Sequence, residues 1–526
     1  MKTEVVVIGG GATGAGVFRD LALRGLEVVL LEKADLTSGT SGRNHGLLHS
    51  GARYAVYDPD SARECFQENA LIKKIAAPCL EETGGFFLSL PEDPPEYADT
   101  LLRACHSLGI PAKEVAVADV LHQETKLSPR VKRAIWVPDA SVDPFRLIRA
   151  NIEAGENLGG RVFLHRQVVE IFTARGKVTG VKAIDPRTGE EFKIQCHFLI
   201  NAAGVWAGEI ARLAGINLGI LFSKGSLVVF NQRLVNAVIN RCRPPANGDI
   251  FVPHGPTLIL GTTSQTVAQV DDPFPEIEEV DLLLGEGEKM IPQTKETRVI
   301  RAYAGIRPLL GAREAEREAG PETPNASEAD GRRLSRDFLL VNHGAQDQLR
   351  GFFSICGGKL TTYRLMAEKT VDAVMDEIGR KESCRTAEIP LPFPREYSFH
   401  ALEKKLLKIA QIPSANVPQE IVCECELVSK KEILQEVGKL GIFSLKELQE
   451  RTRAGMGPCQ GGFCAPRLTA LLLETGKITA AEALTILKNF LEERWKGIRP
   501  VLWGPQLREE QLIQALYTEF FNLDRF

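Results

Sequence analysis

The sequence predicts an α/β protein whose largest domain is a Rossmann-like fold. Three apolar strands run directly into glycine-containing turns, at VVVIGGGATGAG (5–16), FLINAAGVW (198–206) and FFSICGGKLTTYR (352–364). The chain has 526 residues, of which 44% are hydrophobic, so it can bury a large core, and its length predicts three or four domains. Because the three turns are far apart in the sequence, we expect distant segments to meet along one extended cofactor.

The first turn lies inside a predicted βαβ unit. A β-branched strand at 5–8 precedes the glycines, a helix follows from about 12 to 24, and a second strand lies at 27–31. This order of strand, glycine turn, helix and strand is the context that makes a glycine motif specific for dinucleotides.

Each glycine of this motif has a separate task. Gly9, Gly11 and Gly14 match the pattern G-x-G-x-x-G. Gly9 permits the tight turn, Gly11 lets the backbone approach a pyrophosphate, and Gly14 lets the helix pack closely on the strand. Glu32 ends the second strand, where its carboxylate can accept hydrogen bonds from a ribose.

The glycine motif alone does not separate NAD from FAD. The wide spacing of the three turns favours FAD, since flavoproteins hold one long cofactor with several distant segments. No second dinucleotide motif follows, which argues against NAD as the electron acceptor for the reduced flavin.

Charge and targeting signals exclude several classes of protein. The formal net charge of −4 gives no sign of a nucleic-acid binder. The first strand begins so early that we expect no signal or transit peptide, and no apolar run approaches the length that spans a bilayer. We therefore expect a cytoplasmic protein.

Four of the eleven cysteines form a candidate metal site. Cys423 and Cys425 form C-x-C, and Cys459 and Cys464 form C-x4-C further along the chain. Two close pairs of thiolates can converge on one tetrahedral sulfur site. Structural zinc is one interpretation, but zinc sites more often use C-x2-C pairs, so the spacing favours a [2Fe–2S] cluster. We expect the other seven cysteines to be reduced, and most of them to be buried: Cys65, Cys79, Cys105, Cys196, Cys242, Cys356 and Cys384.

The segment DLTSGTSGRNHGLLHSGARYAVYD (35–58) is the strongest candidate for ligand contact outside the glycine turns. It is rich in Gly, Ser and Thr, carries two arginines and two histidines, and has no clear periodicity. These features predict a long loop with a short helix that approaches the cofactor.

Several segments together resemble the FAD-dependent sn-glycerol-3-phosphate dehydrogenases. They are TSGRNHGLLHSGARYA, KGSLVVF (224–230), LILGTTS (258–264), RAYAGIRPLL (301–310) and GGKLTTYRLMAE (357–368), and the likeness runs through most of residues 1–385. CEC (423–425) and GMGPCQGGFC (455–464) resemble a bacterioferredoxin-associated-ferredoxin type domain. Its fusion behind the flavin domain, and NFLEERWKGIRPVLWG (489–504), are similar to the large (A) subunits of the anaerobic branch.

The resemblance implies how the chain is divided. A D-amino-acid-oxidase-like FAD-binding body would use residues 1–75, 155–215 and 345–385. Residues 76–154 and 216–344 would form an α+β substrate domain, within which the charged stretch 312–336 is expected to be a mobile surface loop. A linker at 386–420 would lead to the [2Fe–2S] domain at 421–475 and a C-terminal helical segment at 476–526.

The resemblance also implies which residues contact ligands. Cations suit a phosphate-bearing substrate, and the catalytic or substrate-binding set would be His49, Arg53, Tyr54, Arg307 and Lys359. Some relatives place a histidine after the Lys-Gly-Ser of KGS, where this chain has Leu227, so His49 is the best remaining candidate for the base. The FAD-binding set would be Gly9, Gly11, Ala12, Thr13, Gly14, Glu32, Lys33, Thr40, Ser41, Arg43, Asn44, His45, Gly46, Val169, Ala203, Gly204, Gly358, Lys359, Leu360 and Thr361.

The implied reaction is oxidation of sn-glycerol 3-phosphate, a small phosphorylated polyol, to dihydroxyacetone phosphate. Electrons would pass through the cluster to companion flavin and iron–sulfur subunits and then to quinone, so that membrane association is indirect, at the inner face of the cell membrane. Two alternatives stay open. NHGLLHSG also resembles 2-hydroxyglutarate dehydrogenases, with amino-acid and opine dehydrogenases as further relatives, and the chain could be a zinc-stapled assembly subunit without turnover.

Overall fold

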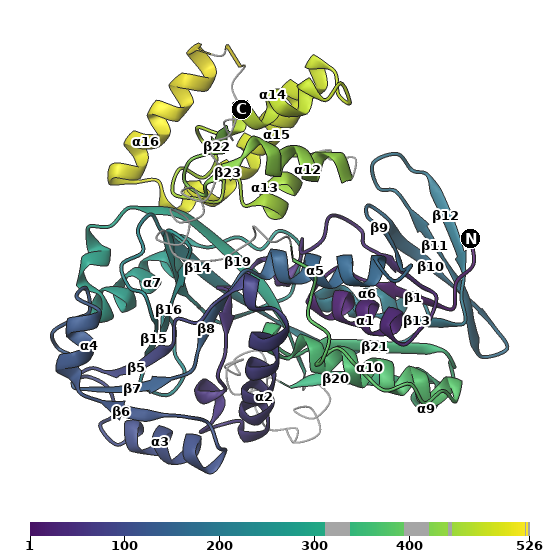
Figure 1. Ribbon diagram of the computed structural model, residues 1–526, viewed down its shortest axis with the longest axis horizontal. Coiled ribbons are helices and arrows are strands. Elements are labelled where there is room, and N and C mark those ends of the chain that lie inside the picture. Colours follow the sequence, from purple (N-terminus) through teal and green to yellow (C-terminus); the bar gives the residue numbers. More distant parts are fainter. Residues whose placement is uncertain (311–336, 394–419, 440–443, 521, 524–526) are drawn as a thin grey trace, which may run out of the picture.

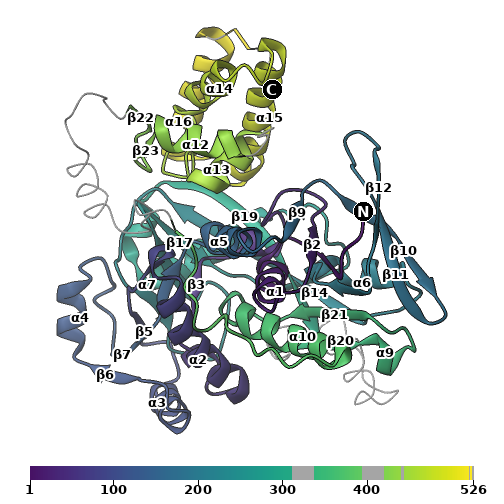
Figure 2. The same cartoon turned by 45° about the vertical axis from the view of Figure 1, so that its right-hand side comes forward.

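The computed structural model describes residues 1–310, 337–393, 420–439, 444–520 and 522–523. Figure 1 shows three parts, which we name by their sheets and position: a dinucleotide-binding body around a six-stranded sheet, a nine-stranded-sheet domain beside it, and a C-terminal domain that rests on both. Figure 2 shows the C-terminal domain standing over the body and the larger sheet.

The six-stranded sheet confirms the predicted Rossmann-like fold. Its strands, in spatial order, are β20 (Phe338–Asn342), β21 (Phe352–Gly357), β13 (Phe198–Asn201), β1 (Val5–Ile8), β2 (Val28–Leu31) and β9 (Arg161–Phe163). β1 runs parallel to both β2 and β13, and β20 is antiparallel to β21. Strands β1, β13 and β21, which precede the three predicted glycine turns, are neighbours in the sheet. Those turns therefore lie side by side at the carboxyl ends of these strands.

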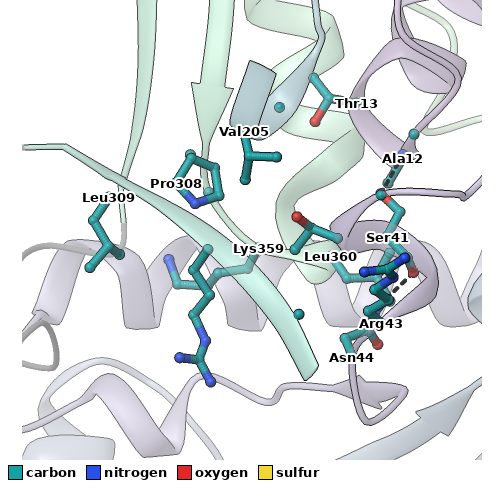
Figure 3. Close-up of a pocket in the computed structure, with 18 of the residues that line it drawn as sticks. Ala12, Thr13, Ser41, Arg43, Asn44, Val205, Pro308, Leu309, Lys359 and Leu360 are labelled. Atoms are coloured by element: carbon teal, nitrogen blue, oxygen red, sulfur yellow. Dashed lines mark hydrogen bonds between the residues drawn. The ribbon is translucent and has the colours of Figure 1, made fainter. Parts of the chain in front are cut away.

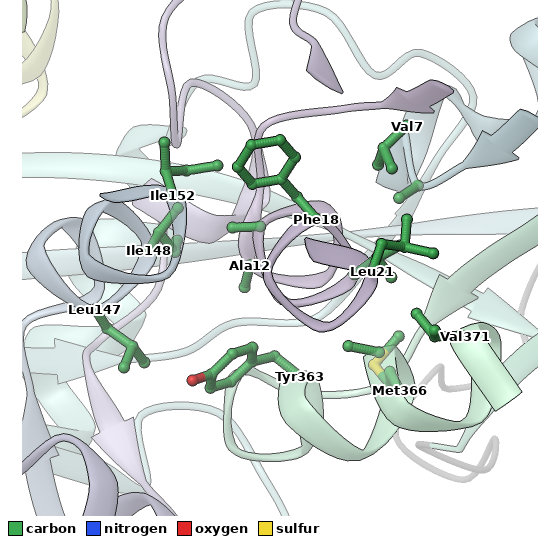
Figure 4. Packing of buried hydrophobic residues seen from close by; sticks show 14 of the residues in the cluster. Val7, Ala12, Phe18, Leu21, Leu147, Ile148, Ile152, Tyr363, Met366 and Val371 are labelled. Atoms are coloured by element: carbon green, nitrogen blue, oxygen red, sulfur yellow. The ribbon is translucent and has the colours of Figure 1, made fainter. Parts of the chain in front are cut away.

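Three helices cover one face of this sheet: α1 (Ala12–Leu23), α5 (Pro144–Glu156) and α10 (Tyr363–Ile378). Figure 4 shows Phe18 and Leu21 of α1 packed between side chains of the other two helices. The ring of Phe18 is fully buried and leaves no room for side chains at Gly155 or Gly160, where an added Cβ would lie 2.4 and 2.5 Å from it. Although 76–154 was expected to cover the substrate, α5 packs on α1, because Ile148 and its neighbours join the core of the body.

We expect Ile148→Val to destabilise the protein by about 0.5–1.5 kcal/mol, since it removes a methylene from this packed face. Ile148 is 1% exposed, whereas Ile277 is 64% exposed, so Ile277→Val is the matched control with little expected effect. Denaturant unfolding followed by circular dichroism measures both. Equal midpoints for the two variants would contradict the packing described here.

The opposite face of the six-stranded sheet is covered by a small antiparallel sheet. Its strands are β10 (Gln167–Ala174), β11 (Lys177–Ile184) and β12 (Glu191–Gln195). Apolar residues of β10 to β12 pack against the outer side chains of β1 and β2 in one buried cluster. Strands β1 and β2 are therefore buried on both faces, which explains their continuous β-branched and aliphatic sequences.

The nine-stranded sheet forms the second part. Its strands are β5 (Gly85–Ser89), β6 (Lys113–Val115), β7 (Arg133–Val137), β14 (Ile220–Phe230), β15 (Val238–Arg241), β16 (Ile250–His254), β17 (Thr257–Gly261), β18 (Gln265–Val267) and β19 (Val299–Leu310). Helices α3 (Tyr97–Ser107), α4 (Val117–Gln123) and α7 (Ile277–Met290) pack against it. The long strands β14 and β19 pair along almost their whole length and run toward the body.

Shorter elements connect the two sheets. β3 (Leu47–Leu48), β8 (Ala140–Val142) and β4 (Leu80–Glu81) form a three-stranded sheet, and β3 belongs to the predicted loop at 35–58. That loop otherwise contains two short 3-10 turns, at Thr40–Gly42 and Ala52–Tyr54. Helix α2 (Pro59–Ile75) follows this loop, whereas α6 (Ala207–Arg212) and α9 (His343–Gln346) pack on strands of the six-stranded sheet.

The C-terminal domain is mainly helical, as predicted. Its elements are β22 (Ile421–Cys423), β23 (Val428–Ser429), α12 (Lys430–Lys439), α13 (Leu445–Thr452), α14 (Ala465–Glu474), α15 (Ala480–Ile498) and α16 (Gly504–Ala515). They enclose a separate apolar core, in which Cys423 and Cys464 are buried.

Two expectations fall on residues that the structure does not describe. The predicted mobile loop at 312–336 lies wholly outside the described residues, and the predicted linker at 386–420 does so from 394 to 419. Across the described helices, none has both the length and the apolar sequence needed to cross a lipid bilayer.

Candidate functional site

A cavity of about 1260 Å³ lies where the six-stranded sheet meets β14 and β19. It collects almost every residue predicted from the sequence to contact cofactor or substrate. Figure 3 shows Ala12 and Thr13 of α1, the loop residues Ser41, Arg43 and Asn44, and Lys359 with Leu360 around one space. The other predicted residues that line it are Gly9, Gly11, Glu32, Lys33, Thr40, His45, His49, Arg53, Tyr54, Val169, Ala203, Gly204, Arg307 and Gly358.

The glycine turn forms one end of the cavity. Gly9 has a φ of +112°, a conformation that favours glycine. A Cβ at Gly14 would lie 1.9 Å from the carbonyl oxygen of Gly9, so Gly14 serves the contact between helix and strand. A Cβ at Gly11 would instead approach only the Ser41 side chain, at 3.0 Å, because Gly11 faces the cavity. The turn at Gly9 and the close packing at Gly14 agree with their predicted tasks, and the approach of a pyrophosphate to Gly11 stays a prediction.

Glu32 stands beside the turn at the end of β2. Its carboxylate accepts hydrogen bonds from the backbone N–H of Gly10 at 2.7 Å and of Ala34 at 2.9 Å. Burial raises the pKa of Glu32, and the two N–H donors oppose that shift. The carboxylate both lines the cavity and fixes the loop that leads away from β2.

Three of the cations that line the cavity are those predicted to bind substrate: Arg53, Arg307 and Lys359. Arg307 of β19 donates to the hydroxyl of Thr262 and to the carbonyl of Thr263. Lys359 donates to Ser61 Oγ at 2.9 Å and lies over the ring of Tyr54.

Arg53, the third cation, is ion-paired with Asp249, and it also donates to the carbonyl of Arg241. Part of its charge is thereby compensated within the protein. The hydrogen bonds of Arg307 to Ser223, Thr262 and Thr263 go to neutral oxygens.

Two histidines stand on the same loop as Arg53. The rings of His45 and His49 lie 6.0 Å apart, and the His49 ring is 5.2 Å from that of Tyr54. Burial, Arg307 and Arg53 lower the pKa of His45 to about 3, so this imidazole stays neutral at physiological pH. A base works best with a pKa near the working pH, so His45 is unsuited to the role and His49 is left as the candidate.

Three predicted contact residues do not line the cavity. Gly14 packs on Gly9, as described above. Gly46 has a φ of +67° and faces the carbonyl of Val142 and the ring of His254. Thr361 is fully buried, and its hydroxyl accepts the backbone N–H of His49 at 3.1 Å. These residues lie next to the cavity wall, on its side away from the cavity, and support it.

The four predicted cysteine ligands come together in the C-terminal domain. Cys425 and Cys459 have their Sγ atoms 3.7 Å apart, and the thiols of Cys423 and Cys464 also interact. The contact with Cys425 lowers the pKa of Cys459 to about 6, with help from the N–H groups of Phe463 and Gly461 and from Arg494. The contact with Cys464 likewise lowers the pKa of Cys423.

The arrangement of the four thiols fits a [2Fe–2S] cluster, in which each of two irons takes two thiolates. The thiols lie in two pairs, Cys425 with Cys459 and Cys423 with Cys464, and each pair is also within electrostatic reach of the other.

Comparison with known families agrees with both sites. Residues 4–364 match the profile of the FAD dependent oxidoreductase family, and residues 421–474 match that of the BFD-like [2Fe-2S] binding domain. The A subunit of the anaerobic glycerol-3-phosphate dehydrogenase of Escherichia coli (strain K12) is 40% identical, with 100% of this chain and 98% of the relative covered. The A1 subunit of the enzyme of the same name from Haloferax volcanii is 39% identical, over 99% of this chain and 91% of that one.

The chain belongs to the family of anaerobic glycerol-3-phosphate dehydrogenase A subunits.

A solved structure supports the fold of this anaerobic glycerol-3-phosphate dehydrogenase family member. The glycerol-3-phosphate dehydrogenase of Bacillus halodurans complexed with FAD aligns with a TM-score of 0.63 at 21% identity, over 96% of each chain. The residues present here fit FAD, because Gly11 leaves a cradle that a side chain would fill and because the buried His45 Nδ1 has no hydrogen-bond partner among the described residues. The predicted cofactors, FAD and a [2Fe–2S] cluster, are those of the two matched domains.

Some residues at the two sites were not predicted from the sequence. Trp206 lines the cavity with Lys33 3.5 Å over its ring, and its only sequence signal is its place directly after the Ala-Ala-Gly turn. Asp249 was not predicted because its pairing with Arg53 joins segments nearly 200 residues apart. Arg453 connects the C-terminal domain to the body through Asp143, while it also pairs with Glu426 of its own domain, and no local pattern marks it.

We expect Gly11→Ala to weaken FAD binding by about 1–3 kcal/mol, since its methyl group enters the space beside Ser41 that the cofactor needs. Gly208→Ala is the control, because a Cβ there meets nothing closer than 3.7 Å. Flavin absorbance of the dialysed proteins and titration of the apoproteins with FAD measure the effect. Equal affinity in both variants would show that the cofactor does not pass Gly11.

Proposed function

We propose that this chain oxidises sn-glycerol 3-phosphate to dihydroxyacetone phosphate and sends the electrons through its C-terminal domain to partner subunits and then to quinone. One observation carries this proposal: the cavity that holds the glycine turn also holds the cations Arg307 and Lys359 beside His49. FAD bound there would supply the acceptor for a hydride from the substrate carbon.

The cations would bind the phosphate. The guanidinium of Arg307 is held in place by Thr262 and Thr263, and its fork suits two phosphate oxygens. Lys359 would contribute a second positive charge, which Ser61 and the Tyr54 ring orient. Arg53 would support this wall from its ion pair with Asp249.

His49 would take the proton of the substrate hydroxyl at one ring nitrogen. Its backbone N–H is fixed by Thr361, and its ring packs edge-on against Tyr54, so its direction is set before substrate arrives. His45, being neutral and buried, would donate or accept a hydrogen bond in the same cavity. Proton removal by His49 and charge binding by Arg307 would thus act on opposite ends of a short substrate.

The C-terminal domain would be the exit for electrons. A [2Fe–2S] cluster held by its four cysteines would supply one-electron transfer. Arg453 pairs with Glu426, which follows Cys425 in the sequence, and with Asp143 of the body. These ion pairs would hold the C-terminal domain in a fixed position on the body. Companion flavin and iron–sulfur subunits would receive the electrons, and they would bring the cytoplasmic chain to the membrane surface.

Turnover with a dye acceptor tests the substrate. The purified protein, loaded with FAD, is expected to reduce the dye with glycerol 3-phosphate and to leave 2-hydroxyglutarate and amino acids unused. Preference for 2-hydroxyglutarate would replace the proposed substrate and keep the enzyme class. Absence of turnover, with zinc and no iron by metal analysis, would instead indicate a structural role in assembly.

A further inference from the structure

A second cavity of about 470 Å³ lies between the C-terminal domain and the rest of the chain. Its walls come from the loop after β2, from β19, and from α13 and α15. Arg43 and Asn44 line both this cavity and the larger one, so a single stretch of loop separates them. No part of the proposed reaction uses this second space.

Positive charge predominates around the second cavity. The basic side chains that line it are Arg43, Arg301, Lys446, Arg453, Arg494 and Lys496. The acidic ones are Asp272, Glu450 and Glu493. Some of these cations form ion pairs with residues that do not line the cavity: Arg453 pairs with Glu426, and Arg494 pairs with Glu510. Lys496 pairs with Glu493 of the cavity itself.

Arg301 is the exceptional member of this set. Within the described residues its guanidinium has no hydrogen-bond or ion-pair partner, although it is partly buried on the wall of the cavity. Burial lowers the pKa of Arg301, and the nearby charges of Arg494 and Arg43 add to that shift, while Tyr303 and Glu493 oppose it. A partly buried charge without a partner loses some of its hydration, so the protein keeps Arg301 at a cost in stability.

Packing fixes the position of this guanidinium. Arg301 lies flat against Gly497 of α15, where an added Cβ would come within 2.7 Å of its Nε. Tyr303, two residues along β19, is also held, because its hydroxyl donates to the carbonyl of Asn44 at 2.8 Å. The cavity therefore presents a cation on rigid elements, as a built binding site does.

The remaining walls are apolar or aromatic. Phe145, Phe274, Tyr303 and Phe490 line the cavity, together with Pro144, Pro273 and Pro275. We propose that this second cavity binds a small organic oxyanion, a phosphate or carboxylate attached to an apolar group, with Arg301 as its principal contact. Such a ligand would neutralise the unpaired charge and would bridge the body and the C-terminal domain.

Calorimetric titration of the holoenzyme with phenyl phosphate tests this site. Wild type is expected to bind one more equivalent of phenyl phosphate than Arg301→Met does. If the variant still binds at this site, its affinity for phenyl phosphate there should be at least about tenfold lower than that of wild type. Arg298→Met is the matched control, because Arg298 lies just before β19 and contacts Gln506 and Glu509 outside the cavity. The control should bind as wild type does.

Three further measurements separate the parts of the proposal. Orthophosphate and benzoate should bind more weakly than phenyl phosphate, since each lacks either the apolar group or the phosphate. Without ligand, Arg301→Met should melt at or above the wild-type temperature, and phenyl phosphate should raise the melting temperature of wild type by more than that of the variant. Arg301→Gln is used if the methionine variant does not fold. Identical stoichiometry and affinity in wild type and the Arg301 variants would overturn the site, and equal binding of orthophosphate and phenyl phosphate would overturn the apolar part.

Discussion

Replacing Arg307 with alanine is expected to reduce kcat/KM for glycerol 3-phosphate by roughly 30- to 5,000-fold, which corresponds to a loss of about 2–5 kcal/mol of transition-state stabilisation. The reason is the position of Arg307 on the cavity wall, where the hydroxyl of Thr262 and the carbonyl of Thr263 orient its guanidinium. Steady-state kinetics with a dye acceptor measure the loss.

Arg307→Lys should recover part of this activity, since lysine keeps the charge but lacks the fork of the guanidinium. Flavin content should be unchanged in both variants, which separates a substrate defect from a cofactor defect. Near-normal kcat/KM in the alanine variant would move the phosphate to another part of the cavity, with Lys359 the next residue to test.

Replacing both Cys459 and Cys464 with serine is expected to remove or alter the cluster and to abolish most electron transfer to partner subunits and quinone. Each replacement breaks a different thiol pair, Cys425 with Cys459 and Cys423 with Cys464. Iron analysis and the visible spectrum of anaerobically purified protein report the loss.

The same double variant should keep the first half of the reaction. Glycerol 3-phosphate should still bleach the flavin in an anaerobic single turnover, because the cavity that contains Arg307 and His49 includes none of the cysteines. Quinone reduction at the normal rate through the partners would show that electrons leave directly from the flavin. One zinc and no iron in the wild type would show that the four thiols form a structural zinc site.

The parts of this protein that follow from short-range sequence could be predicted well. The strand Val5–Ile8, the helix from Ala12, the turn at Gly9 and the close packing at Gly14 all depend on residues within one βαβ unit, where periodicity and backbone sterics decide the outcome. The convergence of the four cysteines could likewise be anticipated from spacing. Their pairing across the two motifs, Cys425 with Cys459 and Cys423 with Cys464, needed coordinates.

Features that depend on contacts between distant segments could not be predicted. The ion pair of Arg53 with Asp249 is one, because no local pattern announces which carboxylate meets a given guanidinium. The packing of α5 on α1 is another, since the apolar face of α5 could equally have covered the larger sheet. The second cavity exists only because the C-terminal domain rests on the body, and a sequence read segment by segment does not show that contact.

Strand β19 has a consequence for how this protein can change over evolution. Arg307 faces the larger cavity and Arg301 the smaller one, and the two are six residues apart on one continuous strand. Side chains alternate between the faces of a strand, so inserting or deleting one residue between them would turn one arginine away while leaving the other in place. Divergent descendants of this chain should therefore tolerate substitutions along the strand far better than any change in the number of residues between the two arginines.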